Sequence, residues 1–156
     1  MLVEADKRNE KVNLLYLNQE FGIPENVYII GMMNTADRSL AMLDYALRRR
    51  FAFYEMRPGF EAEGFRDYRT AMKNDKLNSL IRCVENLNSV ISADDSLGDG
   101  FCIGHSYFCN LTAETITDRK LSAIVEYELI PLLKEYWFDE PLKVKDWTNN
   151  LRSAIK

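Results

Sequence analysis

The chain has 156 residues, of which 47% are hydrophobic and 28% charged, and its formal net charge is −4. The length suffices for one domain or two small ones, with a composition typical of soluble globular proteins. Because the net charge is negative, the electrostatic field of the chain as a whole does not attract nucleic acid. No apolar run approaches the ~20 residues of a membrane helix, and the first residues are acidic where a signal peptide is basic. We expect a cytoplasmic protein without a membrane partner.

The N-terminal quarter leads to one strongly apolar stretch. Residues 1–8 have the pattern of the last turns of a helix, and residues 9–24 that of a connecting segment in which residues 12–17 can form a short strand. A nearly all-apolar run with β-branched and aromatic residues then extends from Val27 to Met33. This run predicts a buried strand.

Polar residues follow that strand directly. Asn34, Thr35 and Asp37 stand where the strand emerges, and in open α/β sheets ligands bind at this edge. Asp37 or Ser39 can cap a helix, whose apolar stripe is formed by Leu40, Leu43 and Leu47. Asn34 and Asp37 can equally be no more than a turn and a cap.

Three consecutive arginines, Arg48, Arg49 and Arg50, end this predicted helix, and a second candidate strand begins at residue 51. Arginine in a last helical turn is favoured by the helix dipole. Successive helical residues point about 100° apart, so the three cannot share one partner. We expect one of them to face a group outside its own helix, and phosphate is the usual planar, bidentate partner.

Beyond Arg57-Pro58-Gly59, a turn sequence, the apolar period is helical. Helices are predicted over 60–73, from Asp75 over four turns, from Asp118, and over 142–151, with a loop at 94–100. Pro131 should kink or break the third of these helices. The predicted core of this helical bundle consists of Leu80, Ile81, Val84, Leu87, Ile124, Val125 and Leu133.

Two further kinds of site are conceivable in this region: a metal site at the cysteines and a base-stacking surface at the aromatic residues. Cys102, His105 and Cys109 have metal-like spacing, but a structural zinc site needs a fourth ligand, so buried free thiols and no metal site are expected. A set of aromatic residues can stack nucleic-acid bases or, as we expect from their helical spacing, fill the core. These are Tyr107, Phe108, Tyr127, Tyr136, Trp137, Phe138 and Trp147.

Four motifs resemble the McrB family, the AAA+ GTPase subunits of modified-cytosine-dependent McrBC restriction systems. They are Met33-Asn-Thr-Ala-Asp-Arg-Ser39, Asp44-Tyr-Ala-Leu-Arg-Arg-Arg-Phe51, Gly104-His-Ser-Tyr-Phe-Cys109 and Trp147-Thr-Asn149. The resemblance implies an α+β, mostly helical fold. Residues 1–58 would be the second half of the AAA+ α/β core, with the sensor 1 strand and the arginine-finger helix, and residues 59–156 the all-α lid.

The resemblance also implies roles for individual residues. Asn34 takes the position of sensor 1, where an amide can bond the γ-phosphate or the attacking water. Arg49 corresponds to an arginine finger that reaches the nucleotide of a neighbouring subunit, with Arg50 and Asp44 in the same intersubunit network. The other positions implied in nucleotide binding are Thr35, Asp37, Arg38, His105 and Ser106.

The complete family protein uses GTP and Mg²⁺ in a ring of AAA+ subunits, expected to be hexameric, with an McrC-like nuclease and DNA bound through an N-terminal domain. This sequence has no Gly-x4-Gly-Lys-Ser/Thr loop and no apolar strand ending in Asp-Glu, which supply the phosphate cradle and the magnesium ligand. We therefore expect no tight nucleotide binding and no hydrolysis by this chain alone. The alternatives are a non-catalytic AAA+ interaction module and a DNA-binding domain that uses the arginines directly.

Overall fold

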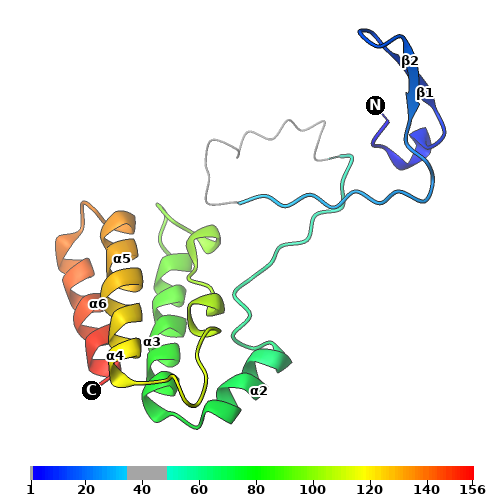
Figure 1. Ribbon diagram of the computed structural model, residues 1–156. Helices are drawn as coiled ribbons and strands as arrows, with labels where there is room; N and C mark the ends of the chain where they lie inside the picture. Colours follow the sequence, from blue (N-terminus) through cyan, green and yellow to red (C-terminus); the bar gives the residue numbers. More distant parts are fainter. Residues whose placement is uncertain (1, 35–48) are drawn as a thin grey trace. The chain divides into compact units, whose positions relative to one another are not determined.

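The computed structural model describes residues 2–34 and 49–156, and the chain divides into two compact units, Met1–Glu55 and Met56–Lys156. The first contains a small two-stranded sheet and the second is helical (Figure 1). The α+β, mostly helical fold class predicted from the sequence is confirmed. No helix in the described ranges is long and apolar enough to span a bilayer.

A short hairpin is the regular part of the first unit. The 3-10 turn η1 (Ala5–Lys7) precedes strands β1 (Lys11–Leu14) and β2 (Gln19–Gly22), which pair antiparallel. An ion pair of 2.7 Å between Lys11 and Glu20 crosses the hairpin. The helix expected over residues 1–8 is therefore only one 3-10 turn, and the strand expected over 12–17 is shifted, because its second half forms the hairpin loop.

The buried strand predicted over 27–33 is not formed. The chain from residue 27 to residue 34 has no regular secondary structure and is exposed, with Ile30 91% and Met32 97% accessible. A strand requires neighbours for its backbone N–H and C=O groups. In the described part of the chain, β1 and β2 use each other as partners. The same reason applies to the second predicted strand at 51–54, and the helix predicted after Asp37 lies outside the described residues.

The second unit is a bundle of helices, as the apolar period predicted. Its elements are α2 (Glu63–Met72), α3 (Asp75–Ser92), η2 (Asp99–Phe101), η3 (His105–Phe108), α4 (Asp118–Ala123), η4 (Ile124–Leu129), α5 (Ile130–Tyr136) and α6 (Pro141–Ala154). Helix α6 packs against both α3 and α5 (Figure 1). Helices α3 and α4 begin directly after a capping side chain: Asn74 accepts a hydrogen bond from the Leu77 amide, and Thr117 accepts one from the Lys120 amide.

Pro131 does not end its helix, but the helix changes register just before it. The six residues of η4 form a π-helix directly before α5, and the Ile130 amide donates to the Val125 carbonyl five residues back. A proline ring clashes with the carbonyl four residues earlier and leaves that carbonyl without a donor. The wider π turn shifts the hydrogen-bond register ahead of Pro131, and α4, η4 and α5 therefore follow one another without interruption.

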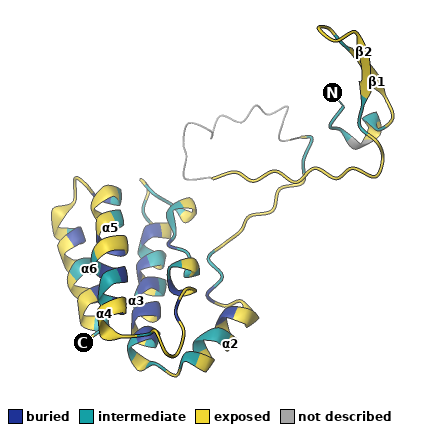
Figure 2. Cartoon of the chain, in the orientation of Figure 1, coloured by how far each residue is buried: buried dark blue, intermediate teal, exposed yellow. Residues whose placement is uncertain are grey.

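All seven residues predicted for the core are buried: Leu80, Ile81, Val84, Leu87, Ile124, Val125 and Leu133. Figure 2 shows buried, dark blue segments on α3 and along the other helices of the bundle. The aromatic prediction is only partly right. Phe108 and Trp137 are buried, but Tyr127 is 80% and Phe138 82% exposed.

Candidate functional site

Asn34 is the last residue that the structure describes before residue 49. It is exposed and follows the irregular apolar segment that begins at Val27. Four other predicted nucleotide-site residues, Thr35, Asp37, Arg38 and Asp44, lie outside the described residues. Their grouping with Asn34 stays a prediction from the sequence.

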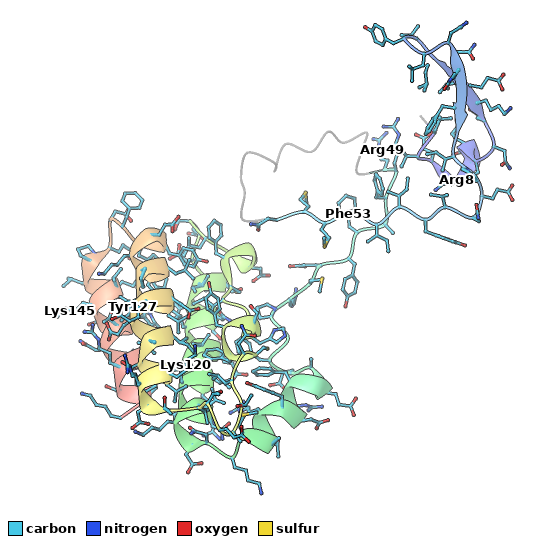
Figure 3. All side chains as sticks on the ribbon, viewed as in Figure 1. Arg8, Arg49, Phe53, Lys120, Tyr127 and Lys145 are labelled. Carbon is cyan, nitrogen blue, oxygen red and sulfur yellow. The ribbon has the colours of Figure 1, made fainter. Side chains whose placement is uncertain are left out.

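Arg49 and Arg50 differ in their surroundings although they are neighbours. Arg50 is half-buried and forms an ion pair with Glu4, whose pKa is lowered mainly by this hydrogen bond. Arg49 is exposed, and within the described part of the chain it has no ion pair (Figure 3). Arg49 is therefore available for a partner, whereas Arg50 is engaged by Glu4. The pairing of an arginine with Asp44 lies outside the described residues and stays a prediction.

His105, in η3, is fixed on both sides of its ring. Its Nδ1 accepts a hydrogen bond of 3.0 Å from the Gly59 amide. The rings of Phe65 and Phe60 meet the imidazole edge-on, with centroids at 5.2 and 6.2 Å. A neutral imidazole that accepts at Nδ1 carries its proton on Nε2, so Nε2 is the atom that can donate. The neighbouring Ser106 is exposed.

The Gly59–His105 contact also explains why the turn at 57–59 ends in glycine. A Cβ at position 59 would lie 2.9 Å from Cε1 of His105, closer than nonbonded carbon atoms approach. His105 therefore ties the start of the second unit to η3. Its observed contacts are those of a structural residue, and a nucleotide-binding role remains a prediction.

The cysteines are free thiols, as expected, but they are not buried. Cys83 and Cys102 are half-buried and Cys109 is exposed. Partial burial raises the pKa of the Cys83 and Cys102 thiols. In the described ranges no group of three His, Cys, Asp or Glu side chains is placed to hold a metal ion.

Two polar side chains that sequence reasoning missed hold the loops of the second unit. The Asn88 amide pairs with both backbone groups of Ile103, at 2.8 Å to the carbonyl and 2.7 Å from the amide. The Tyr68 hydroxyl lies 2.7 Å from both the Phe108 and Leu111 carbonyls, and burial raises its pKa. Asn88 lies four residues after Val84, on the apolar stripe of the predicted helix. A polar residue within that stripe was the feature of the sequence that could have identified Asn88.

Asp94 was predicted only as part of a loop, but it joins three helices. One carboxylate oxygen accepts hydrogen bonds from the Trp137 indole at 2.8 Å and the Lys143 ammonium at 2.6 Å. The other oxygen accepts from the Ser96 amide and hydroxyl. Bonds from Lys143, Ser96 and Trp137 hold the Asp94 pKa well below its usual range. The Lys143 ammonium also lies 4.4 Å from the Trp137 ring centre.

Comparison with known proteins gives two matches. Residues 79–145 match the family model "McrB, alpha-helical lid domain". The chain is 49% identical, over 97% of its length, to the "Type IV methyl-directed restriction enzyme EcoKMcrB subunit" of Escherichia coli (strain K12). It spans 35% of that relative's length.

The two matches agree with the residues that suggested the resemblance. The lid match begins within α3 and ends within α6, and it includes the Gly104–Cys109 motif and the Asp94 network. The longer match covers both units. The chain is therefore similar to an McrB subunit over almost its whole length, and its residues 79–145 are similar to the alpha-helical lid domain of McrB.

Proposed function

We propose that this chain contributes sensor 1 and a trans-acting arginine finger to the NTPase motor of a restriction system. Asn34 would position the γ-phosphate or attacking water, and Arg49 would reach the nucleotide of a neighbouring subunit. The observation that carries the proposal is the contrast between the exposed Arg49 and the ion-paired Arg50. Its support is the 49% identity to a restriction-enzyme subunit.

The chemistry follows from what the sequence contains. Phosphoryl transfer needs a phosphate cradle, a magnesium ligand and a positioned water, and the sequence has no motif for the first two. A P-loop-bearing subunit would supply these together with GTP and Mg²⁺. The assembly would be a ring of AAA+ subunits in the cytoplasm with an McrC-like nuclease partner. The modified base in the DNA would be read by a separate domain.

A reconstitution experiment tests whether Arg49 acts as the trans-acting arginine finger. The P-loop partner is an McrB-type subunit whose own residue equivalent to Arg49 is alanine. We expect no GTP or ATP turnover by this chain alone, and restored turnover on mixing. Arg49→Ala in this chain should abolish the restoration, with a loss on the order of 10³-fold, because a trans finger stabilises transition-state charge. Lys11→Ala, which removes an exposed cation from the same unit, is the matched control.

Two outcomes would contradict the proposal. Phosphate release by the chain alone that Asn34→Ala abolishes would show that it holds a complete site. Restoration that survives Arg49→Ala would show that Arg49 is not the finger. Each variant needs a check that it still joins the partner, by size-exclusion chromatography.

A second candidate function is assembly without catalysis. The exposed apolar side chains of the first unit, among them Tyr16, Ile30 and Met32, favour a role in which another polypeptide covers them, since large exposed apolar patches mark interaction sites. In this case the chain joins the P-loop partner but leaves its turnover unchanged. The same mixing experiment separates the two functions.

A further inference from the structure

A hollow of about 440 Å³ lies on the second unit, between α2 and α3. Its lining contains no hydrophobic or acidic residue. The residues that line it are Arg66, Arg69, Thr70, Lys73, Asn78 and Arg82. We refer to these six residues as the basic groove.

Three of the cations come from α2 and the residue that follows it. Arg66 and Arg69, at i and i+3, lie on one side of α2, and Lys73, the left-handed residue directly after the helix, lines the same hollow. Arg82, from α3, adds a fourth cation from the opposite wall.

One of the four cations is held in place and three are free to bind. Arg69 donates from Nε to Oδ1 of Asn78 at 2.6 Å, and its Nη1 lies 4.0 Å from the Glu85 carboxylate. Arg66, Lys73 and Arg82 are exposed, and in the described ranges none of them has an ion pair. Because Glu85 offsets one of the four charges, about three positive charges remain uncompensated within a short distance, in a chain whose net charge is −4.

We propose that the basic groove binds the phosphate backbone of a nucleic acid without reading its base sequence. Arginine forks bond phosphate oxygens in pairs, and the Thr70 hydroxyl and Asn78 amide are further phosphate donors of the usual kind.

The lining also argues against other partners. A protein partner is expected to bury hydrophobic side chains at the centre of its interface, and no hydrophobic residue lines the groove. Base recognition in single strands uses aromatic stacking, and no aromatic residue lines the groove. The proposal concerns DNA contact rather than nucleotide turnover, so it does not depend on the roles proposed for Asn34 and Arg49.

The test compares two triple variants of the full chain. The groove variant is Arg66→Gln, Lys73→Gln and Arg82→Gln, which leaves the anchored Arg69 in place. The control is Arg119→Gln, Lys120→Gln and Lys145→Gln, which removes the same charge from exposed positions on α4 and α6, two of them labelled in Figure 3. Fluorescence anisotropy with a labelled mixed-sequence DNA duplex, measured over a series of salt concentrations, gives the affinity and its salt dependence.

We expect the groove variant to weaken binding at least about tenfold at low salt and to flatten the plot of log affinity against log salt by roughly two to three units, about 0.9 per lost phosphate contact. The control variant should retain most of the affinity. Circular dichroism checks that each variant is folded. If the groove variant unfolds, Arg66→Gln and Arg82→Gln taken singly should each lower the slope by about one unit.

Three results would overturn the proposal. The two triple variants could lose affinity equally, which would indicate attraction by total charge. Arg49→Gln could abolish binding while the groove variant does not, which would place the DNA contact at the arginine run. Polyglutamate could displace the duplex at equal charge concentration, which would indicate an acidic polypeptide as the partner.

Discussion

At the residue scale, single polar contacts fix the loops of the second unit. His105 accepts the Gly59 amide, and Asn88 pairs with both backbone groups of Ile103. Each contact satisfies loop backbone groups that no helix ladder can satisfy. These side chains therefore position the segment from 102 to 108, which contains the Gly104–Cys109 motif.

Gly59→Ala should lower the melting temperature of the second unit. The new Cβ would lie 2.9 Å from His105 Cε1, so either the ring or the turn must move, and the hydrogen bond to Nδ1 is strained or lost. We expect a cost of about 1 to 3 kcal/mol, measured by thermal denaturation followed by circular dichroism.

The control for that substitution is Gly64→Ala. Gly64 lies in α2, with nothing within 4 Å of a Cβ placed there. Because alanine favours helix over glycine by up to about 1 kcal/mol, this variant should be slightly more stable than the wild type. Equal melting temperatures for Gly59→Ala and wild type would contradict the steric role of the Gly59–His105 contact.

At the element scale, α3 is the helix on which the bundle is built. Six of its side chains are fully buried along one face: Leu77, Leu80, Ile81, Val84, Leu87 and Ile91. It contacts α6, and its C-terminal end leads to the Asp94 network. Helix stability in such a bundle comes from burial of the apolar face more than from intrinsic propensity.

Leu87→Ala should destabilise the bundle by about 2 to 5 kcal/mol, the usual cost of removing a large buried side chain and leaving a cavity. Urea denaturation followed by circular dichroism measures the free energy of unfolding. Leu142→Ala, at a position of α6 that is 75% exposed, should change it by less than about 0.5 kcal/mol. Similar costs for the two variants would be inconsistent with the observed packing.

At the scale of the whole second unit, Asp94 links the ends of α3, α5 and α6 through one half-buried carboxylate. Hydrogen bonds to an ionised group stabilise more than neutral ones. The network therefore connects elements that are distant in sequence and makes their association sensitive to acid.

The Asp94 pKa is lowered on folding, chiefly by Lys143, then by Ser96 and Trp137. Its contribution to stability is therefore complete above the unfolded pKa, about 3.9, and is lost as the pH falls through that value towards the folded pKa. Asp94→Asn should lower the free energy of unfolding by about 1 to 3 kcal/mol at pH 7. The difference from wild type should shrink as the pH falls below 4, in urea titrations at several pH values.

Asp95, the exposed residue next to Asp94, provides the control for the acid dependence. Asp95→Asn removes the same charge one residue away, where the side chain is exposed, and should leave the pH dependence as in the wild type. A gap between wild type and Asp94→Asn that stays constant from pH 7 to acid would show that the ionised carboxylate is not the stabilising group.

The sequence by itself determined the helical bundle and its core, because burial of apolar surface dictates a 3.6-residue period that can be read directly. It also determined the family resemblance, because the motifs that carry the resemblance are runs of consecutive residues. It could not decide the segment from 27 to 33, because a strand depends on its neighbours, and an apolar run carries no information on whether a neighbour is present.

Tertiary structure alone decided the contacts between distant residues. The partner of Arg50 is Glu4, 46 residues away, and Asp94 meets Trp137 and Lys143 across 43 and 49 residues. The basic groove depends on both sequence and fold. Helical spacing places Arg66 and Arg69 on one side of α2, whereas only the folded arrangement of α2 and α3 brings Arg82 to the same hollow. Local sequence fixes which way a side chain points along its own helix, whereas its partner is fixed by the chain that folds against it.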